Sequence, residues 1–215
     1  MHAGFPCFIQ DIQKVMQLGA NSDETPKLLE SAGGTVIASG IAVLLKLGFG
    51  FIMRNSLVDA EQAKKANSFF EDNFVITDPY APNGRRFYQG KFLIRTQKPG
   101  DDMNVWLRFC NKPDELFVKT PFGEALNPLA VVDSKVLKEH KANQIAKNPD
   151  QVDLVISFRD LNAMLGLVGR ANVDIVGLLL ENVVLLKGNV GHLFKLGAIA
   201  KDIELSLEDS GGLIH

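Results

Sequence analysis

The chain has 215 residues, of which 46% are hydrophobic and 22% are charged, and its formal net charge is −2. This length and apolar fraction allow a sizeable buried core and exclude disorder over the whole chain. The charge balance, with no Lys/Arg block interleaved with aromatic residues, argues against nucleic acid as a partner. Cys7 and Cys110 show neither metal-site spacing nor a disulfide framework, and no signal peptide is evident, so a cytoplasmic location is expected.

The N-terminal part of the chain predicts helices. A short amphipathic helix is expected at about 9–18, and residues 35–53 then form a nearly unbroken apolar run that approaches the roughly twenty residues of a membrane span. Lys46 argues against a span, because a lysine near the bilayer centre costs about 2.5–3.5 kcal/mol. A helix buried in the core is preferred over one that lines a lipid cavity or touches a membrane. A further amphipathic helix is expected over 58–74.

The turn-rich segment 78–84 predicts a boundary between an N-terminal helical region, 1–83, and a second domain, 84–215. Three antiparallel strands in succession are expected at 86–96, 103–109 and 116–119. A helix with its lysines facing outward is expected over 131–146.

The last third of the chain carries the most informative pattern. A strand is expected at 152–158, and Asp160 then precedes an apolar helical stripe as a candidate N-cap. A second short apolar helix and a strand at 182–189 follow, and Gly188-Asn189 supplies the turn into an apolar tail. The predicted order is strand, helix, helix, strand, turn, helix.

This order, with Leu165-Gly-Leu-Val-Gly169 after the first helix and Leu186-Lys-Gly-Asn189 after the second strand, resembles the sterol-carrier-protein type 2 domain. The resemblance covers about 85–207 and is closest over 152–197. It departs from many members at Ile175-Val-Gly-Leu-Leu-Leu180, where they carry small residues and Phe-Met. The resemblance implies an α+β fold with a mixed, largely antiparallel sheet of about five strands, covered by helices on one face. It also implies an apolar tunnel for sterols, fatty acyl chains or other lipids.

No pattern of catalytic or metal-binding residues is evident. His2 and His215 lie at the ends of the sequence, and His192 follows a glycine turn. His192 precedes Lys195 by three residues and could contact a lipid head group, but an exposed or helix-capping role is the commoner one. A basic cluster is interpreted as a solvated helix face, with anionic lipid head groups as the alternative partner. It comprises Lys135, Lys138, His140, Lys141 and Lys147.

We therefore predict a protein that is not an enzyme, needs no cofactor and carries a hydrophobic ligand, with peripheral membrane contact as a further expectation. One alternative is a scaffold that docks proteins or a membrane through the 35–53 helix, and another, less favoured, is an enzyme acting on acyl or isoprenoid chains. The C-terminal segment 191–203 is predicted to be a movable wall of the ligand site. The predicted lining residues are Phe92, Ile94, Leu107, Phe109, Leu165, Val168, Ile175, Leu179, Leu185, Phe194, Leu196 and Ile199.

Overall fold

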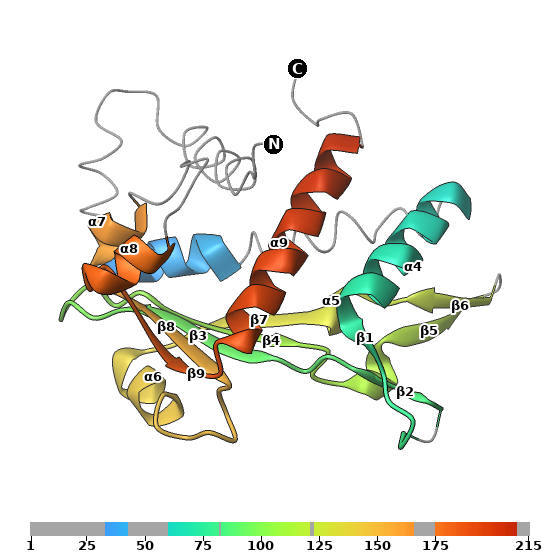
Figure 1. The fold of residues 1–215 in the computed structure, drawn as a ribbon, viewed down its shortest axis with the longest axis horizontal. Helices are drawn as coiled ribbons and strands as arrows, with labels where there is room; N and C mark the ends of the chain where they lie inside the picture. Colours follow the sequence, from blue (N-terminus) through green and yellow to red (C-terminus); the bar gives the residue numbers. More distant parts are fainter. Residues whose placement is uncertain (1–32, 43–59, 82, 121–122, 166–174, 210–215) are drawn as a thin grey trace.

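A computed structural model describes residues 33–42, 60–81, 83–120, 123–165 and 175–209. At its centre is a five-stranded mixed sheet in the order β7-β4-β3-β8-β9 (Figure 1). Its strands are β3 (Lys91–Thr96), β4 (Asn104–Phe109), β7 (Val132–Val136), β8 (Leu154–Phe158) and β9 (Val184–Gly188). Within this sheet β3 and β8 are parallel and the other neighbouring pairs are antiparallel. The predicted α+β class and the mixed, largely antiparallel sheet are confirmed.

Helices lie on both sides of the sheet. They are residues 33–42, α4 (Ala60–Phe74), α5 (Pro128–Val131), α6 (Glu139–Ile145), α7 (Leu161–Leu165), α8 (Ile175–Leu180) and α9 (Gly191–Asp209), with a 3-10 turn η2 (Pro113–Glu115). We call the side that carries Phe92 and Leu107 the helix-covered face, because α4, α7, α8, α9 and residues 33–42 lie there (Figure 1).

The opposite side carries Leu93 and Val155, and we call it the α6 face. Ala142 and Ile145 of α6 are buried against these two residues. The prediction that helices cover one face is therefore wrong. Successive side chains of a strand point to opposite faces, so Leu93 of β3 and Val155 of β8 make the second face apolar as well. The helix α6 buries this second face.

Two short hairpins extend the structure. They join β1 (Val75–Thr77) to β2 (Arg85–Phe87) and β5 (Phe117–Thr120) to β6 (Gly123–Leu126). The segment 78–84, predicted as a domain boundary, is the turn of the first hairpin. On its N-terminal side, α4 packs Phe70 and Phe74 into the same buried cluster as the sheet. The described residues on the two sides of this turn therefore share one core.

The middle of the chain differs most from the sequence prediction. The strand expected at 116–119 is β5, which pairs with β6 and lies outside the main sheet. The helix expected over 131–146 is wrong, because residues 132–136 form β7 and pair with β4. The third strand of the predicted meander is thus β7, and the helix is shortened to α6.

The side chains of β7 explain this error. Val132 and Ser134 are buried, whereas Lys135 is exposed and Asp133 points to the same side as Lys135. That is the alternation of a strand with one covered face. The lysines further along the chain recur at a spacing of three, which by itself suggests a helix face.

Aromatic rings fasten α4 to the helix-covered face. Phe70 and Phe74 are 1% and 0% exposed. The ring centroid of Phe74 lies 5.4 Å from that of Phe109 on β4 and 5.6 Å from that of Phe70. Ring pairs at such separations add about 0.5–1.5 kcal/mol each beyond the burial of their area.

Residues 33–42 are a core helix, as the preferred interpretation of the apolar run predicts. Ile37 and Ala38 are 1% and 0% exposed, and the Ser134 hydroxyl donates to the Ala42 carbonyl at 2.9 Å. Lys46, the rest of the run and the helix predicted at 9–18 lie outside the described residues. Across the part of the chain that is described, no helix is both long and apolar enough to cross a bilayer.

Candidate functional site

Four of the predicted lining residues share the helix-covered face of the sheet. Phe92 of β3 pairs with Leu107 of β4, and Ile94 lies two positions further along β3. Phe92 and Leu107 are 0% exposed and Phe109 is 1% exposed, whereas Ile94 is half-buried. The structure therefore brings these four side chains together as one apolar floor under the helices.

The helices over this floor contribute part of the remaining set. Ile199 of α9 is 1% exposed, and Leu196, one turn earlier, is half-buried against the same cluster. Leu179 of α8 is half-buried. The side chains of Leu165 and Ile175 are not described, and Val168 lies outside the described residues.

Leu185 and Phe194 do not join the other predicted lining residues. Leu185 pairs with Ser157 on the α6 face and is 41% exposed, because strand alternation turns its neighbours in β9 inward instead. Phe194 is 72% exposed on α9. The inward side of that helix carries residues spaced by three, such as Leu196 and Ile199, and Phe194 falls outside this stripe.

The helical cover is apolar but incompletely buried. Large side chains of α8 and α9 are half-buried where they pack on the cluster, notably Leu178, Leu193 and Leu196. Leu180 at the end of α8 is 78% exposed. The floor of the site is thus closed by packing, whereas the cover keeps apolar surface that a further apolar group can bury.

Tyr88 and His192 form a polar pair at the N-terminal end of α9, which the sequence did not predict. The Tyr88 hydroxyl oxygen is 2.7 Å from Nδ1 of His192, and the two rings stack at a centroid distance of 5.6 Å. The ring of Phe92 meets the His192 ring edge-on at 6.0 Å. Burial raises the pKa of Tyr88, and the charge of Asp153 raises it further. Tyr88 therefore stays protonated and donates to Nδ1 when the imidazole carries its proton on Nε2.

The backbone leaves room for this pair at Gly90. A Cβ added at Gly90 would lie 2.5 Å from Cζ of Tyr88 and would overlap its hydroxyl oxygen. The sequence signal for the pair is weak, because a tyrosine and a histidine 104 positions apart reveal nothing of their contact. The role of Gly90, two residues after Tyr88, can be recognised only when the position of the tyrosine ring is known.

Two contacts attach α9 to α4. Nδ2 of Asn73, a side chain that is 2% exposed, donates to the carboxylate of Asp202 at 2.8 Å. Nζ of Lys195 donates to the Asp72 carbonyl at 3.4 Å. Burial lowers the pKa of Lys195, and the charges of Asp202 and Asp72 oppose that effect. The movable wall at 191–203 remains a prediction, and its opening would have to break these contacts and expose Ile199.

The described residues define an α+β protein with a helix-covered apolar sheet face and, at its edge, a part-buried pair formed by Tyr88 and His192. Among them, no group of His, Cys, Asp and Glu side chains is placed to hold a metal ion. Comparison with protein-family models, with curated proteins and with solved structures finds no match for this chain.

Proposed function

We propose that this protein binds and carries a hydrophobic ligand, such as a sterol, a fatty acyl chain or another lipid, as a sterol-carrier-protein type 2-like domain. The incompletely buried apolar cover formed by α8 and α9 over the floor of Phe92, Leu107 and Phe109 carries this proposal. A ligand placed there would gain about 25 cal/mol for each Å² of apolar surface removed from water. The protein would act without a cofactor and without chemical turnover, in the cytoplasm, with peripheral contact to membranes.

The order of elements supports the same proposal. β8, α7, α8, β9 and α9 follow one another as the resemblance led us to expect, and they assemble on the sheet formed with β3 and β4. The alternative of docking through residues 35–53 loses support over their first part, since Ile37 and Ala38 of that segment are buried. Residues 43–53 lie outside the described residues, so docking through them stays a prediction.

Ligand displacement tests the proposal. A fluorescent fatty acid and a fluorescent sterol are titrated into the purified protein, and unlabelled ligand is then used to displace them. We expect saturable binding tighter than about 100 μM, which corresponds to about −5.5 kcal/mol. Weaker or non-saturable binding by both probes would remove the carrier function.

A matched pair of leucine substitutions localises the site. Leu196→Ala removes apolar contact area from the inward side of α9 and is expected to weaken ligand binding. Leu129→Ala is the control, because Leu129 is 77% exposed on α5 and the same group is removed. Urea unfolding of both variants separates lost affinity from lost stability. Equal affinities in two folded variants would show that α9 does not line the site.

A further inference from the structure

The α6 face concentrates basic side chains around one short helix. Three of them rise from the sheet and bind α6 or the loop that follows it. Nζ of Lys91 donates to the Asp150 carbonyl at 2.8 Å, Nη1 of Arg95 donates to Oδ1 of Asn143 at 2.7 Å, and Nζ of Lys187 donates to the Ala146 carbonyl at 3.1 Å. All three acceptors are uncharged amide oxygens, so these bonds position the cations without neutralising them.

The last of these bonds has an electrostatic reason. The Ala146 carbonyl lies at the C-terminal end of α6, where helix carbonyls lack partners and carry partial negative charge. The ammonium group of Lys187 is stabilised there. The fold therefore uses cations to hold α6 in place, and their formal charge remains on the surface.

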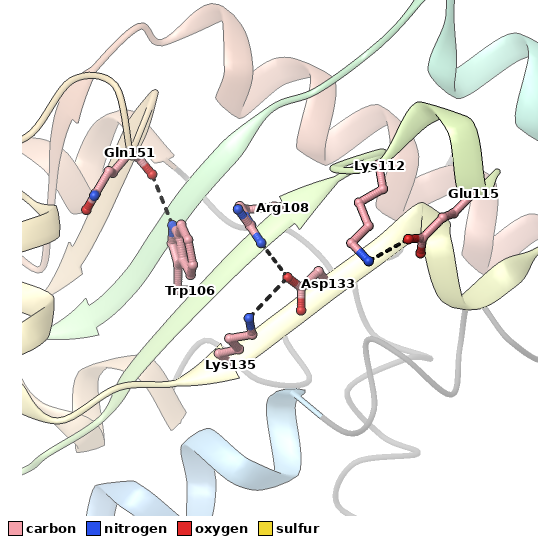
Figure 2. A network of polar contacts seen from close by, with 7 residues as sticks. All are labelled: Trp106, Arg108, Lys112, Glu115, Asp133, Lys135 and Gln151. Atoms are coloured by element: carbon pink, nitrogen blue, oxygen red, sulfur yellow. Dashed lines mark hydrogen bonds and ion pairs between the residues drawn. The ribbon is translucent and has the colours of Figure 1, made fainter.

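Carboxylates balance only part of this charge. Nη2 of Arg108 lies 2.6 Å from Oδ2 of Asp133, and Nζ of Lys135 lies 3.6 Å from the same oxygen (Figure 2). One carboxylate thus serves two cations. The guanidinium carbon of Arg108 also lies 4.2 Å from the ring centroid of Trp106, whose Nε1 donates to the Gln151 carbonyl at 3.1 Å.

Cations outnumber carboxylates on the α6 face. Its carboxylates are Asp133, Glu139, Asp150 and Asp153. Its cations are twice as many: Lys91, Arg95, Arg108, Lys135, Lys138, Lys141, Lys147 and Lys187. The whole chain has a net charge of −2, so this face is positive although the protein is not. Such segregation directs an anionic partner to one side of the molecule.

We propose that the α6 face docks the protein on the anionic surface of a phospholipid bilayer. Each basic residue near such a surface contributes about 1 kcal/mol, and the attraction fades within a Debye length of about 8 Å at physiological salt. The half-buried indole of Trp106 beside Arg108 suits the same environment, because tryptophan is enriched where a bilayer meets water. The choice of a bilayer over an acidic protein rests on the proposed function, since a lipid carrier must meet the membrane it serves.

Vesicle binding with two matched double variants tests the docking surface. Lys138→Gln/Lys141→Gln removes two exposed cations from the α6 face, and Lys64→Gln/Lys201→Gln removes two exposed cations from α4 and α9. Full-length proteins are sedimented with phosphatidylcholine vesicles, with or without phosphatidylserine. We expect binding that needs phosphatidylserine, weakens with salt, falls roughly 30-fold in the first variant and is unchanged in the second.

Three results would overturn the proposal. They are no binding of the unsubstituted protein to phosphatidylserine vesicles, equal losses in the two variants, and binding to an acidic polypeptide with none to vesicles. Fluorescent-lipid displacement on the same proteins keeps the two proposals apart. If both variants bind ligand normally while the unsubstituted protein ignores vesicles, the docking surface fails and the carrier function stands. If vesicles are bound as expected but no apolar ligand is, the carrier function fails.

Discussion

Gly90 is predicted to be the residue that makes room for the Tyr88–His192 pair, and Gly90→Ala tests this directly. The added methyl group would lie 2.5 Å from Cζ of Tyr88, whereas ordinary contacts begin at about 3.4 Å. The Tyr88 ring must therefore retreat by about 1 Å. A displacement of that size disrupts the 2.7 Å contact with Nδ1 of His192, because a hydrogen bond tolerates a change of only a few tenths of an ångström in its length.

The free energy of unfolding should fall by the sum of two effects. Forcing an extra group into a packed site costs about 1–3 kcal/mol, and a lost hydrogen bond costs about 0.5–1.5 kcal/mol. Tyr88 is 8% exposed, so water does not readily replace the bond. We expect Gly90→Ala to destabilise the protein by about 2–4 kcal/mol.

Urea unfolding measures this loss, with the fluorescence of Trp106 as the signal, since it is the single tryptophan of the chain. The control is the same substitution in a Tyr88→Leu background, which removes the hydroxyl oxygen, Cζ and Cε1 that meet the new methyl group. There Gly90→Ala should be close to neutral. A loss below about 0.5 kcal/mol in the unsubstituted protein, or equal losses in both backgrounds, would refute the assignment.

Two further predictions concern single side chains. Asp160 accepts a 2.7 Å hydrogen bond from the Ala163 amide at the start of α7, and this bond is the main reason its pKa is lowered. Asp160→Ala should cost about 0.5–2 kcal/mol at neutral pH, and the part of this difference that depends on the negative charge should be lost as pH falls below about 3.8. Asp160→Asn should retain the hydrogen bond of the cap and should not show this pH dependence. Burial raises the pKa of Cys110 from 9.0 to about 12, so in a Cys7→Ser background folded protein should resist iodoacetamide at neutral pH and react on unfolding. Its contribution to stability should be complete below pH 9.0 and lost as pH rises towards about 12, and rapid alkylation of the native protein would contradict the burial.

Local pattern was enough to predict the order of elements from β8 to α9 in the last third of the chain. Asp160 caps a helix as its position before the apolar stripe predicted, and the order from β8 to α9 is as expected. Each of those elements has a clear hydrophobic periodicity, and a capping or turn residue lies within a few positions of it. The segment 131–146 was predicted wrongly, because the lysine spacing around Lys135 imitates a helix while β7 is defined by its pairing with β4. A contact between distant strands leaves no local signal.

The candidate site was predictable to a similar extent. Phe92 and Leu107 follow from alternation along their strands and lie together as expected. Leu185 was assigned to the wrong side, since a one-residue error in the phase of a strand reverses the face of every side chain. Exposure of Phe194 depends on how α9 is rotated against the sheet, and the helix carries apolar residues on more than one side. Tertiary packing decides that rotation.

The placement of β3 has a consequence for synthesis of the chain. β4 follows β3 directly and can pair with one of its edges early, whereas the parallel partner β8 begins at Leu154, after β7 and α6. Until that segment has left the ribosome, the apolar strand from Lys91 to Thr96 keeps an open edge, which is a template for pairing with other chains. Domains whose central strand waits for a distant partner expose their nascent chains to aggregation. Ribosome-bound chains ending before β8 should therefore recruit chaperones, and chains that extend beyond β9 should release them.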